Sequence, residues 1–167
     1  MNDTPYEIER KFLIRMPDSA LLAGAEASRI TQTYLVPEEG ASSDRVRRRD
    51  YGDRTVYTHT VKTHVSDMRR VEIETEIDRD GYEQLLLRAD PDRRPIEKTR
   101  YCLKLNGLVY EIDVFPFWTR QAYMEIELND ENQRFPWPQG VVCLREVTGD
   151  RRYTNAALAL EIPAEEP

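Results

Sequence analysis

The sequence predicts a mainly β protein of the α+β kind, in which one eight-stranded antiparallel sheet closes into a barrel with a few short flanking helices. Three observations support this fold class. Apolar residues alternate with polar ones in segment after segment, turn residues separate several of these segments, and helical spacing appears only briefly. A length of 167 residues with 40% hydrophobic residues suits one domain over residues 1–167.

Alternation with a period of two marks each expected strand, because side chains two residues apart on a strand point to the same face. The expected strands lie near residues 5–14, 29–36, 44–50, 54–64, 70–77, 95–105, 108–115 and 122–128. The dipeptide Asn106-Gly107 predicts a tight hairpin, since a type I′ turn needs positive φ at both central residues. Eight strands with short connections favour a sheet that closes on itself.

Helices are expected in only three places. The segment from Asp18 to Leu22 has a capping residue at its start, and the segment from Asp78 to Arg88 carries apolar residues at helical spacing. A third short helix is expected from Thr154 to Leu160. No internal repeat and no plausible domain linker interrupts the pattern.

Composition excludes several classes of function. Twenty-four Lys and Arg residues against 31 Asp and Glu residues give a net charge of −7, which disfavours general nucleic-acid binding. No apolar run approaches the roughly 20 residues that span a bilayer, and the first residues do not resemble a signal peptide, so we expect a cytoplasmic protein without a membrane partner. Cys102 and Cys143 are expected to be reduced thiols. A metal ion would therefore be held by oxygen ligands, as Mg²⁺ or Mn²⁺ is.

Residues of like charge stand two positions apart on six separate expected strands. Each pair projects a doubled charge from one face of the sheet, where like charges repel each other. The ordinary interpretation is the solvated face of an amphipathic sheet, but six pairs together indicate a face that binds something charged. The pairs are Glu7 and Glu9, Arg45 and Arg47, Glu72 and Glu74, Lys98 and Arg100, Glu111 and Asp113, and Glu125 and Glu127.

In a closed barrel these side chains would line the lumen together with Lys11 and Lys62. Burying unpaired charges is costly, so an interior rich in both signs is intelligible if it holds a polyanion with its divalent cations. Arginine and lysine would bind phosphate oxygens, and carboxylates would bind Mg²⁺. The pattern predicts phosphoryl chemistry without a glycine-rich phosphate loop, because the sequence contains no such motif.

An ordered series of motifs, which covers nearly the whole chain, resembles the CYTH superfamily, also called the triphosphate tunnel metalloenzymes. The series runs through Glu7-Ile-Glu-Arg-Lys11, Gln32-Thr-Tyr-Leu35, Arg45-Val-Arg47, Thr60-Val-Lys62, Glu72-Ile-Glu74, Lys98-Thr-Arg100-Tyr101, Glu111-Ile-Asp113-Val-Phe115, Glu125-Ile-Glu127 and Arg145-Glu-Val-Thr-Gly149. The resemblance implies an eight-stranded antiparallel tunnel. It also implies hydrolysis or cyclisation of a triphosphate with Mg²⁺ or Mn²⁺, and the short bacterial inorganic triphosphatases look most similar.

The resemblance further implies a role for each charged residue. The main metal ion would be bound by Glu7, Glu9, Glu125 and Glu127. A second metal ion or the attacking water would be held by Glu72, Glu74, Glu111 and Asp113. The triphosphate would be held by Lys11, Arg45, Arg47, Lys62, Lys98, Arg100 and Arg145. Tyr34 and Lys62 match a pair that has been proposed to assist the chemistry, whereas Arg145 stands where many relatives have lysine and could not replace a lysine that must lose a proton.

The expected reaction is hydrolysis of inorganic triphosphate to pyrophosphate and phosphate, by a monomer or homodimer. One alternative is an adenylate cyclase. It would need a pocket for the nucleoside base, and no set of residues in the sequence indicates one. Another is a thiamine triphosphatase, in which Phe117 or Trp118 would stack on the thiazolium ring. An alternative of another class is a polyphosphate or nucleotide sensor without turnover, which would not require so many carboxylates.

Overall fold

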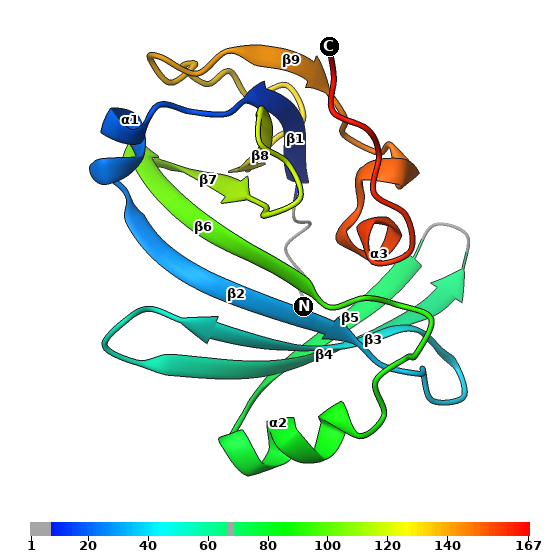
Figure 1. The fold of residues 1–167 in the computed structure, drawn as a ribbon. Helices are drawn as coiled ribbons and strands as arrows, with labels where there is room; N and C mark the ends of the chain where they lie inside the picture. The colour runs from blue at the N-terminus through cyan, green and yellow to red at the C-terminus, as the bar shows by residue number, and fades with distance from the viewer. Residues whose placement is uncertain (1–7, 67–68) are drawn as a thin grey trace. The chain divides into compact units, whose positions relative to one another are not determined.

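The computed structural model describes residues 8–66 and 69–167, in which antiparallel strands predominate (Figure 1). The strands are β1 (Ile8–Arg15), β2 (Glu26–Tyr34), β3 (Ala41–Asp50), β4 (Thr55–Ser66), β5 (Arg69–Ile77), β6 (Ile96–Leu105), β7 (Leu108–Val114), β8 (Gln121–Leu128) and β9 (Cys143–Glu146). They form one sheet in the order β5-β4-β3-β2-β6-β7-β8-β1-β9. The mainly β prediction is confirmed, and each of the eight expected segments forms a strand, β1 to β8.

The prediction of exactly eight strands closed into a barrel is wrong in two respects. A ninth strand, β9, pairs with β1, and its register shifts between Leu13 and Ile14. Four residues are too few to show alternation, so nothing in the sequence marks this strand. Within the described residues the strand order begins at β5 and ends at β9 without joining them, so the sheet is open. A barrel needs that last pairing, and an alternating pattern does not encode which edges meet.

The three expected helices are confirmed as α1 (Ser19–Ala23), α2 (Arg79–Leu86) and α3 (Asn155–Leu158). Two of them have side-chain caps that satisfy an N–H group of the first turn. Asp78 accepts a hydrogen bond of 2.7 Å from the Gly81 N–H, and Thr154 accepts one of 3.1 Å from the Ala157 N–H. No helix in the described part of the chain is long and apolar enough to cross a membrane.

The hairpin between β6 and β7 has the predicted turn. Asn106 has a φ of 51° and Gly107 a φ of 76°, as the two central residues of a type I′ turn require. The turn sets the register of the two strands, so that Arg100 lies opposite Asp113.

The chain divides into two compact units. The first contains the N-terminal segment through Ala27, Thr99–Arg151 and Ala164–Pro167, and the second contains Ser28–Lys98 and Arg152–Pro163. The single domain over residues 1–167 stays a prediction.

The apolar core of the first unit lies on one face of its strands. Phe12, Ile112, Met124 and Ile126 are buried there, and Leu21 of α1 packs against them. Each such side chain gains roughly 2 kcal/mol from leaving water. Because successive side chains alternate, the residues between them in sequence point to the opposite face, which is where the predicted charged residues lie.

The second unit has a smaller core on the face of β3 and β4 against which α2 packs (Figure 1). Val46 of β3 and Tyr82 of α2 are buried in it, and the rings of Tyr57 and Tyr82 lie 4.9 Å apart. Arg45 and Arg47 flank Val46 and therefore point to the other face of β3.

Candidate active site

Strand register gathers charged side chains on one face of the first unit. Residues directly opposite each other on antiparallel strands point to the same side. Glu9 lies opposite Glu127, Lys11 opposite Glu125, Glu111 opposite Glu125, Arg100 opposite Asp113, and Arg145 opposite Leu13. Seven of the residues predicted from sequence to share one charged surface, together with Arg145, thus belong to one face built from five strands.

Glu9 and Glu125 are joined by a hydrogen bond between their carboxyl groups. Burial of the Glu9 carboxyl group raises its pKa to about 8, and the hydrogen bond and the negative charge of Glu125 act in the same direction. Lys11 opposes this effect with its positive charge. Two carboxyl groups this close together are arranged for a cation that could replace the proton of Glu9.

Lys11 lies beside this acid pair. Its Nζ is 3.2 Å from Oε1 of Glu125 and 4.1 Å from the centre of the Tyr123 ring. The side chains of Lys11 and Glu125 are only 14% and 13% exposed, so the ion pair is shielded from water. The contact with the ring face adds a cation–π attraction that holds the ammonium group in place.

Arg100 and Asp113 form a bidentate ion pair inside the sheet. Nε and Nη2 of Arg100 donate to the two oxygens of Asp113 at 2.8 and 2.9 Å, and Nη1 contacts Glu111. Burial alone would lower the pKa of Arg100, but the hydrogen bonds and charges of Asp113 and Glu111 outweigh it and raise the pKa. Asp113 is fully buried, so its charge is balanced mainly by Arg100.

Arg145 of β9 is bound by the C-terminal segment. Its Nη2 and Nε donate to Oε1 of Glu166 at 2.9 and 3.2 Å, and its Nη1 lies 3.6 Å from Asp150. Glu165 accepts hydrogen bonds from the backbone N–H groups of Thr119 and Arg120, chiefly the latter, and these bonds lower the pKa of Glu165. The segment is therefore anchored at Glu165, next to the residue that pairs with Arg145.

The second unit carries its own charged face on β3, β4 and β5. Arg45 lies opposite Thr60, which in turn lies opposite Glu74, and Lys62 lies opposite Glu72. Nη2 of Arg45 is 3.8 Å and Nζ of Lys62 is 3.9 Å from the Glu72 carboxylate, while Thr60 donates a hydrogen bond of 3.1 Å to Glu74. The Nε–H of Arg45 is buried and has no hydrogen-bond partner in the described part of the chain.

Tyr34 lies on the same face of the second unit and is 4% exposed. Gln32, two residues before it on β2, donates a hydrogen bond of 2.7 Å from Nε2 to the Tyr34 hydroxyl. The guanidinium group of Arg93 lies over the Tyr34 ring, 5.5 Å from its centre. Neither Gln32 nor Arg93 was predicted as a site residue, since Gln32 is uncharged and Arg93 stands in a polar loop.

Lys98 is another buried cation of the second unit. It is 3% exposed, and its Nζ donates to Oδ1 of Asn155, the first residue of α3, at 3.5 Å. A primary ammonium group has three donors and no acceptor, so Lys98 is suited to contact anionic oxygens.

Comparison with known proteins identifies the family. The CYTH domain model matches residues 5–136. The chain belongs to the CYTH domain family. An inorganic triphosphatase of Nitrosomonas europaea is 38% identical over 165 residues and aligns over 94% of this chain and 99% of that protein. One of Acetivibrio thermocellus is 34% identical and aligns over 91% of this chain and 92% of that protein.

A crystal structure of an inorganic triphosphatase resembles this CYTH protein over most of its length. The two share 35% sequence identity and superpose with a TM-score of 0.62, covering 95% of this chain and 97% of the other. The ordered motif series therefore corresponds to a shared fold as well as a shared sequence.

The family implies a divalent metal ion, and the acidic side chains of the CYTH protein are suitable ligands for one. Oxygen atoms from Glu9, Glu125 and Glu127 are the ligand type that Mg²⁺ and Mn²⁺ prefer, and burial together with the charge of Glu125 raises the pKa of Glu9. Glu7, the fourth predicted ligand, lies outside the described residues. Within those residues no three acidic, histidine or cysteine side chains are grouped as a ready metal site, although the chemistry of the donors fits.

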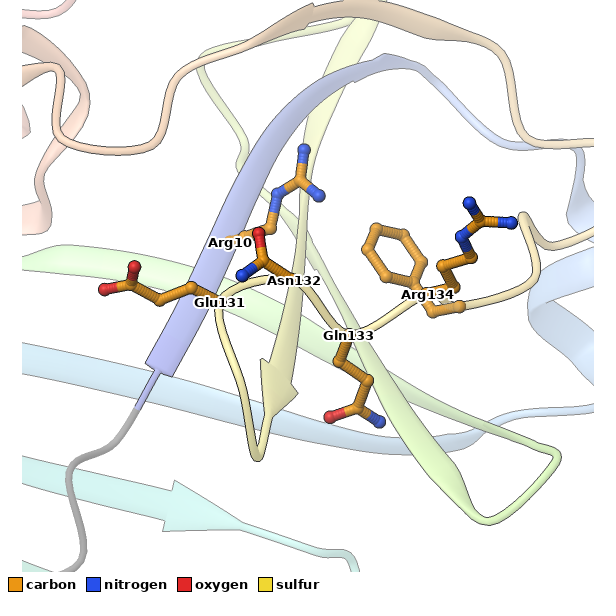
Figure 2. Close-up of a pocket in the computed structure, with 6 residues that line it drawn as sticks. Arg10, Glu131, Asn132, Gln133 and Arg134 are labelled. Atoms are coloured by element: carbon orange, nitrogen blue, oxygen red, sulfur yellow. The ribbon is translucent and has the colours of Figure 1, made fainter.

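A shallow pocket lies elsewhere on the first unit, among Arg10 and the loop after β8 (Figure 2). Arg10 shares a face with Phe12 and Ile126, opposite to Glu9 and Lys11. Its guanidinium group is held by Glu146 at 2.6 and 2.9 Å. The pocket thus belongs to the core side of the sheet and contains none of the predicted site residues.

Trp118 is 3% exposed and belongs to an aromatic cluster with Phe115, Phe117 and Tyr123. Ring centres in the cluster are 5.0 to 5.4 Å apart. These contacts give Trp118 a packing role in the first unit.

Proposed function

We propose that this CYTH protein hydrolyses inorganic triphosphate to pyrophosphate and phosphate with Mg²⁺ or Mn²⁺. Two relatives that align over more than nine-tenths of the chain are inorganic triphosphatases, which supports the choice of substrate. The structural observation that carries the proposal is the Glu9–Glu125 pair. An acid pair in which the pKa of Glu9 is raised, with Lys11 beside it, suits a site that takes up a divalent cation together with a polyanion.

The cations have the first task in the proposed reaction. In hydrolysis a water oxygen bonds to the terminal phosphorus, the bond to the bridging oxygen breaks, and pyrophosphate leaves with the released negative charge. Arginine and lysine stabilise that charge. In the first unit the proposed contacts are Lys11, Arg100 and Arg145, and in the second unit they are Arg45, Arg47, Lys62 and Lys98.

The carboxylates have the second task. Glu9, Glu125 and Glu127, with Glu7, are the proposed ligands of the metal ion, which when bound neutralises phosphate charge and orients the substrate. Glu111 lies opposite Glu125, while Asp113 is engaged by Arg100. Glu72 and Glu74 are the predicted site acids of the second unit and lie opposite Lys62 and Thr60. For these four residues we propose a supporting role in holding cations and water.

Tyr34 and Lys62 are proposed to contact the substrate. The amine of Lys62 is paired with Glu72 at 3.9 Å, and the phenol of Tyr34 is held by Gln32. A lysine can take a proton only after losing its own, so Lys62 serves as a base only if neighbouring cations depress its pKa.

A turnover assay with three substrates tests the proposal. Purified protein with Mg²⁺ or Mn²⁺ is given inorganic triphosphate, ATP or thiamine triphosphate, and phosphate, pyrophosphate and cyclic AMP are measured separately. The expected result is phosphate and pyrophosphate from inorganic triphosphate, little turnover of ATP and no cyclic AMP. Cyclic AMP from ATP would replace the proposal with a cyclase, and tight triphosphate binding without turnover would indicate a sensor.

Substitutions tie the activity to the site. Glu9→Gln and Arg47→Ala should each lower the metal-dependent rate about 10²- to 10³-fold, since each removes a charged contact of the transition state. The matched control is Arg134→Ala, which removes an arginine of the pocket on the core side and should leave the rate unchanged. Retention of metal-dependent turnover in both site variants would contradict the assignment of the site.

A further inference from the structure

Gln32 connects two residues of the proposed site in the second unit. It is fully buried on β2, and it lies directly opposite Arg47 of β3. Its Oε1 accepts hydrogen bonds from Nε and Nη2 of Arg47 at 3.1 and 2.8 Å, and its Nε2 donates to the Tyr34 hydroxyl at 2.7 Å. One amide group therefore links a proposed phosphate-binding cation to a proposed substrate contact.

The direction of these bonds follows from the chemistry of the partners. A guanidinium group has only donors, so the atom of Gln32 that faces Arg47 must be the carbonyl oxygen. The amide –NH₂ group must then face Tyr34, and the phenol oxygen must accept from it. Arg47 thus determines the orientation of the amide, which a distance alone would leave ambiguous.

The phenol proton of Tyr34 consequently points away from Gln32. Arg93, whose guanidinium group lies over the ring, and Arg45, which lies opposite Tyr34 on β3, have side chains with donors only. Within residues 8–66 and 69–167 no side chain or carbonyl group accepts this proton in a hydrogen bond, although Tyr34 is only 4% exposed. Buried O–H groups are normally satisfied, so a donor left over here is one that a ligand would use.

We infer that Gln32 is a positioning residue that makes Tyr34 a hydrogen-bond donor to an anionic oxygen of the substrate. The inference rests on the proposed function for the identity of that anion, a phosphate oxygen. It assigns Tyr34 a direction: the phenol keeps its proton and donates it in a hydrogen bond, and a different group must receive the proton of the attacking water. Arg47 takes part by holding the amide as well as by its own charge.

Gln32→Glu tests the direction directly. A carboxylate has nearly the same shape as the amide and still accepts from Arg47, but it offers Tyr34 an acceptor in place of a donor. The phenol proton then turns to the carboxylate and is lost to the substrate. We expect kcat/KM for inorganic triphosphate to fall about 10- to 100-fold in Gln32→Glu and in Tyr34→Phe.

The double variant separates this effect from the added charge. If Gln32 acts through Tyr34, the Gln32→Glu/Tyr34→Phe protein should be no more than about threefold worse than the poorer single variant. Losses that multiply in the double variant, or a Gln32→Glu protein with full activity, would overturn the inference. Gln84→Glu, on the exposed surface of α2, adds the same charge to the same unit and should have no effect.

Two further measurements keep the outcomes separate. If Gln32→Glu does not fold, as judged by its circular dichroism, the same cycle is made with Gln32→Met, which can form neither hydrogen bond. Binding of inorganic triphosphate in EDTA, measured by calorimetry, repeats the cycle without turnover. If the effects of the two substitutions on triphosphate binding are non-additive but the protein hydrolyses nothing, only the proposed function is refuted. If the protein is active and the effects of the two substitutions on both binding and rate are additive, only the role of Gln32 is refuted.

Discussion

The carboxyl groups of Glu9 on β1 and Glu125 on β8 lie close enough to form a hydrogen bond when Glu9 is protonated. Two ionised carboxylates cannot form this bond, because neither has a donor. The raised pKa of Glu9, about 8, expresses the same fact, since burial and the charge of Glu125 both favour the protonated acid. Any cation that binds both groups must displace the proton.

Metal binding should therefore release protons and strengthen as the pH rises toward 8. Near pH 7, uptake of one Mg²⁺ or Mn²⁺ ion should release close to one proton, and well above pH 8 it should release almost none. Calorimetric titrations in two buffers of different ionisation enthalpy measure this number. Glu9→Gln should abolish the release and weaken metal binding, and a wild-type titration at pH 7 without proton release would contradict the raised pKa of Glu9.

The same acid should make the metal-free protein less stable at higher pH. The folded pKa of Glu9 lies above its ordinary value of 4.5, so the folded state binds more protons than the unfolded state between these values. The contribution of Glu9 to the free energy of unfolding thus declines as the pH rises from about 4.5 to about 8. Glu9→Gln removes this decline.

Urea unfolding in EDTA, at several pH values across that window, measures the decline. As the pH rises, the Glu9→Gln protein should become more stable relative to wild type, as measured by the free energy of unfolding. Glu83→Gln, at an exposed position of α2, serves as the control and should follow the wild-type curve. If the unfolding free energies of Glu9→Gln and wild type change in parallel with pH, the pKa of Glu9 is not raised.

Asp113→Asn should destabilise the protein by about 3 kcal/mol. Asp113 is fully buried, and its loss of charge removes the bidentate partner of Arg100. The comparison is Arg79→Gln, which breaks an exposed ion pair with Glu83 on α2 and should cost far less stability. Urea unfolding measures both values, and equal costs for the two variants would contradict the buried pair.

Glu166→Gln should lower the KM for inorganic triphosphate about two- to threefold. The Glu166 carboxylate bonds to Arg145 at 2.9 Å and carries the same sign of charge as the substrate, so it competes for that cation. The pair is partly exposed, which limits its strength to about 0.5 kcal/mol. Steady-state kinetics test this, with Glu161→Gln, an exposed acid nearby in sequence, as the control. An unchanged KM would show that Arg145 does not contribute to substrate binding.

Period-two alternation predicted strands β1 to β8 because each has one apolar and one polar face. Val46 between Arg45 and Arg47 shows the principle, since it is fully buried in the core while its neighbours point to the charged face. The same rule could not find β9, which is four residues long and pairs through an irregular register. Closure of the sheet was predicted wrongly because strand patterns do not state which edges pair.

The charged face was predictable from residue type and parity, whereas the partner of each charge was not. Arg100 was expected to hold phosphate, yet in the structure it is bound by Asp113. The register of β6 and β7 places these two residues opposite each other. Gln32 was overlooked because a neutral amide leaves no charge signal. Its spacing of two residues before Tyr34 was the available sign, and its position opposite Arg47 needed the register of β2 and β3.

The division of the chain limits how the protein can be dissected. The boundaries between the two units fall inside β2, after Ala27, and inside β6, after Lys98. A gene fragment for residues 28–98 would truncate both strands and omit residues 152–163, which include α3. Neither unit can therefore be expressed as an uninterrupted piece of the gene, and insertions or tags are better tolerated in turns such as that at Gly52 than at the unit boundaries.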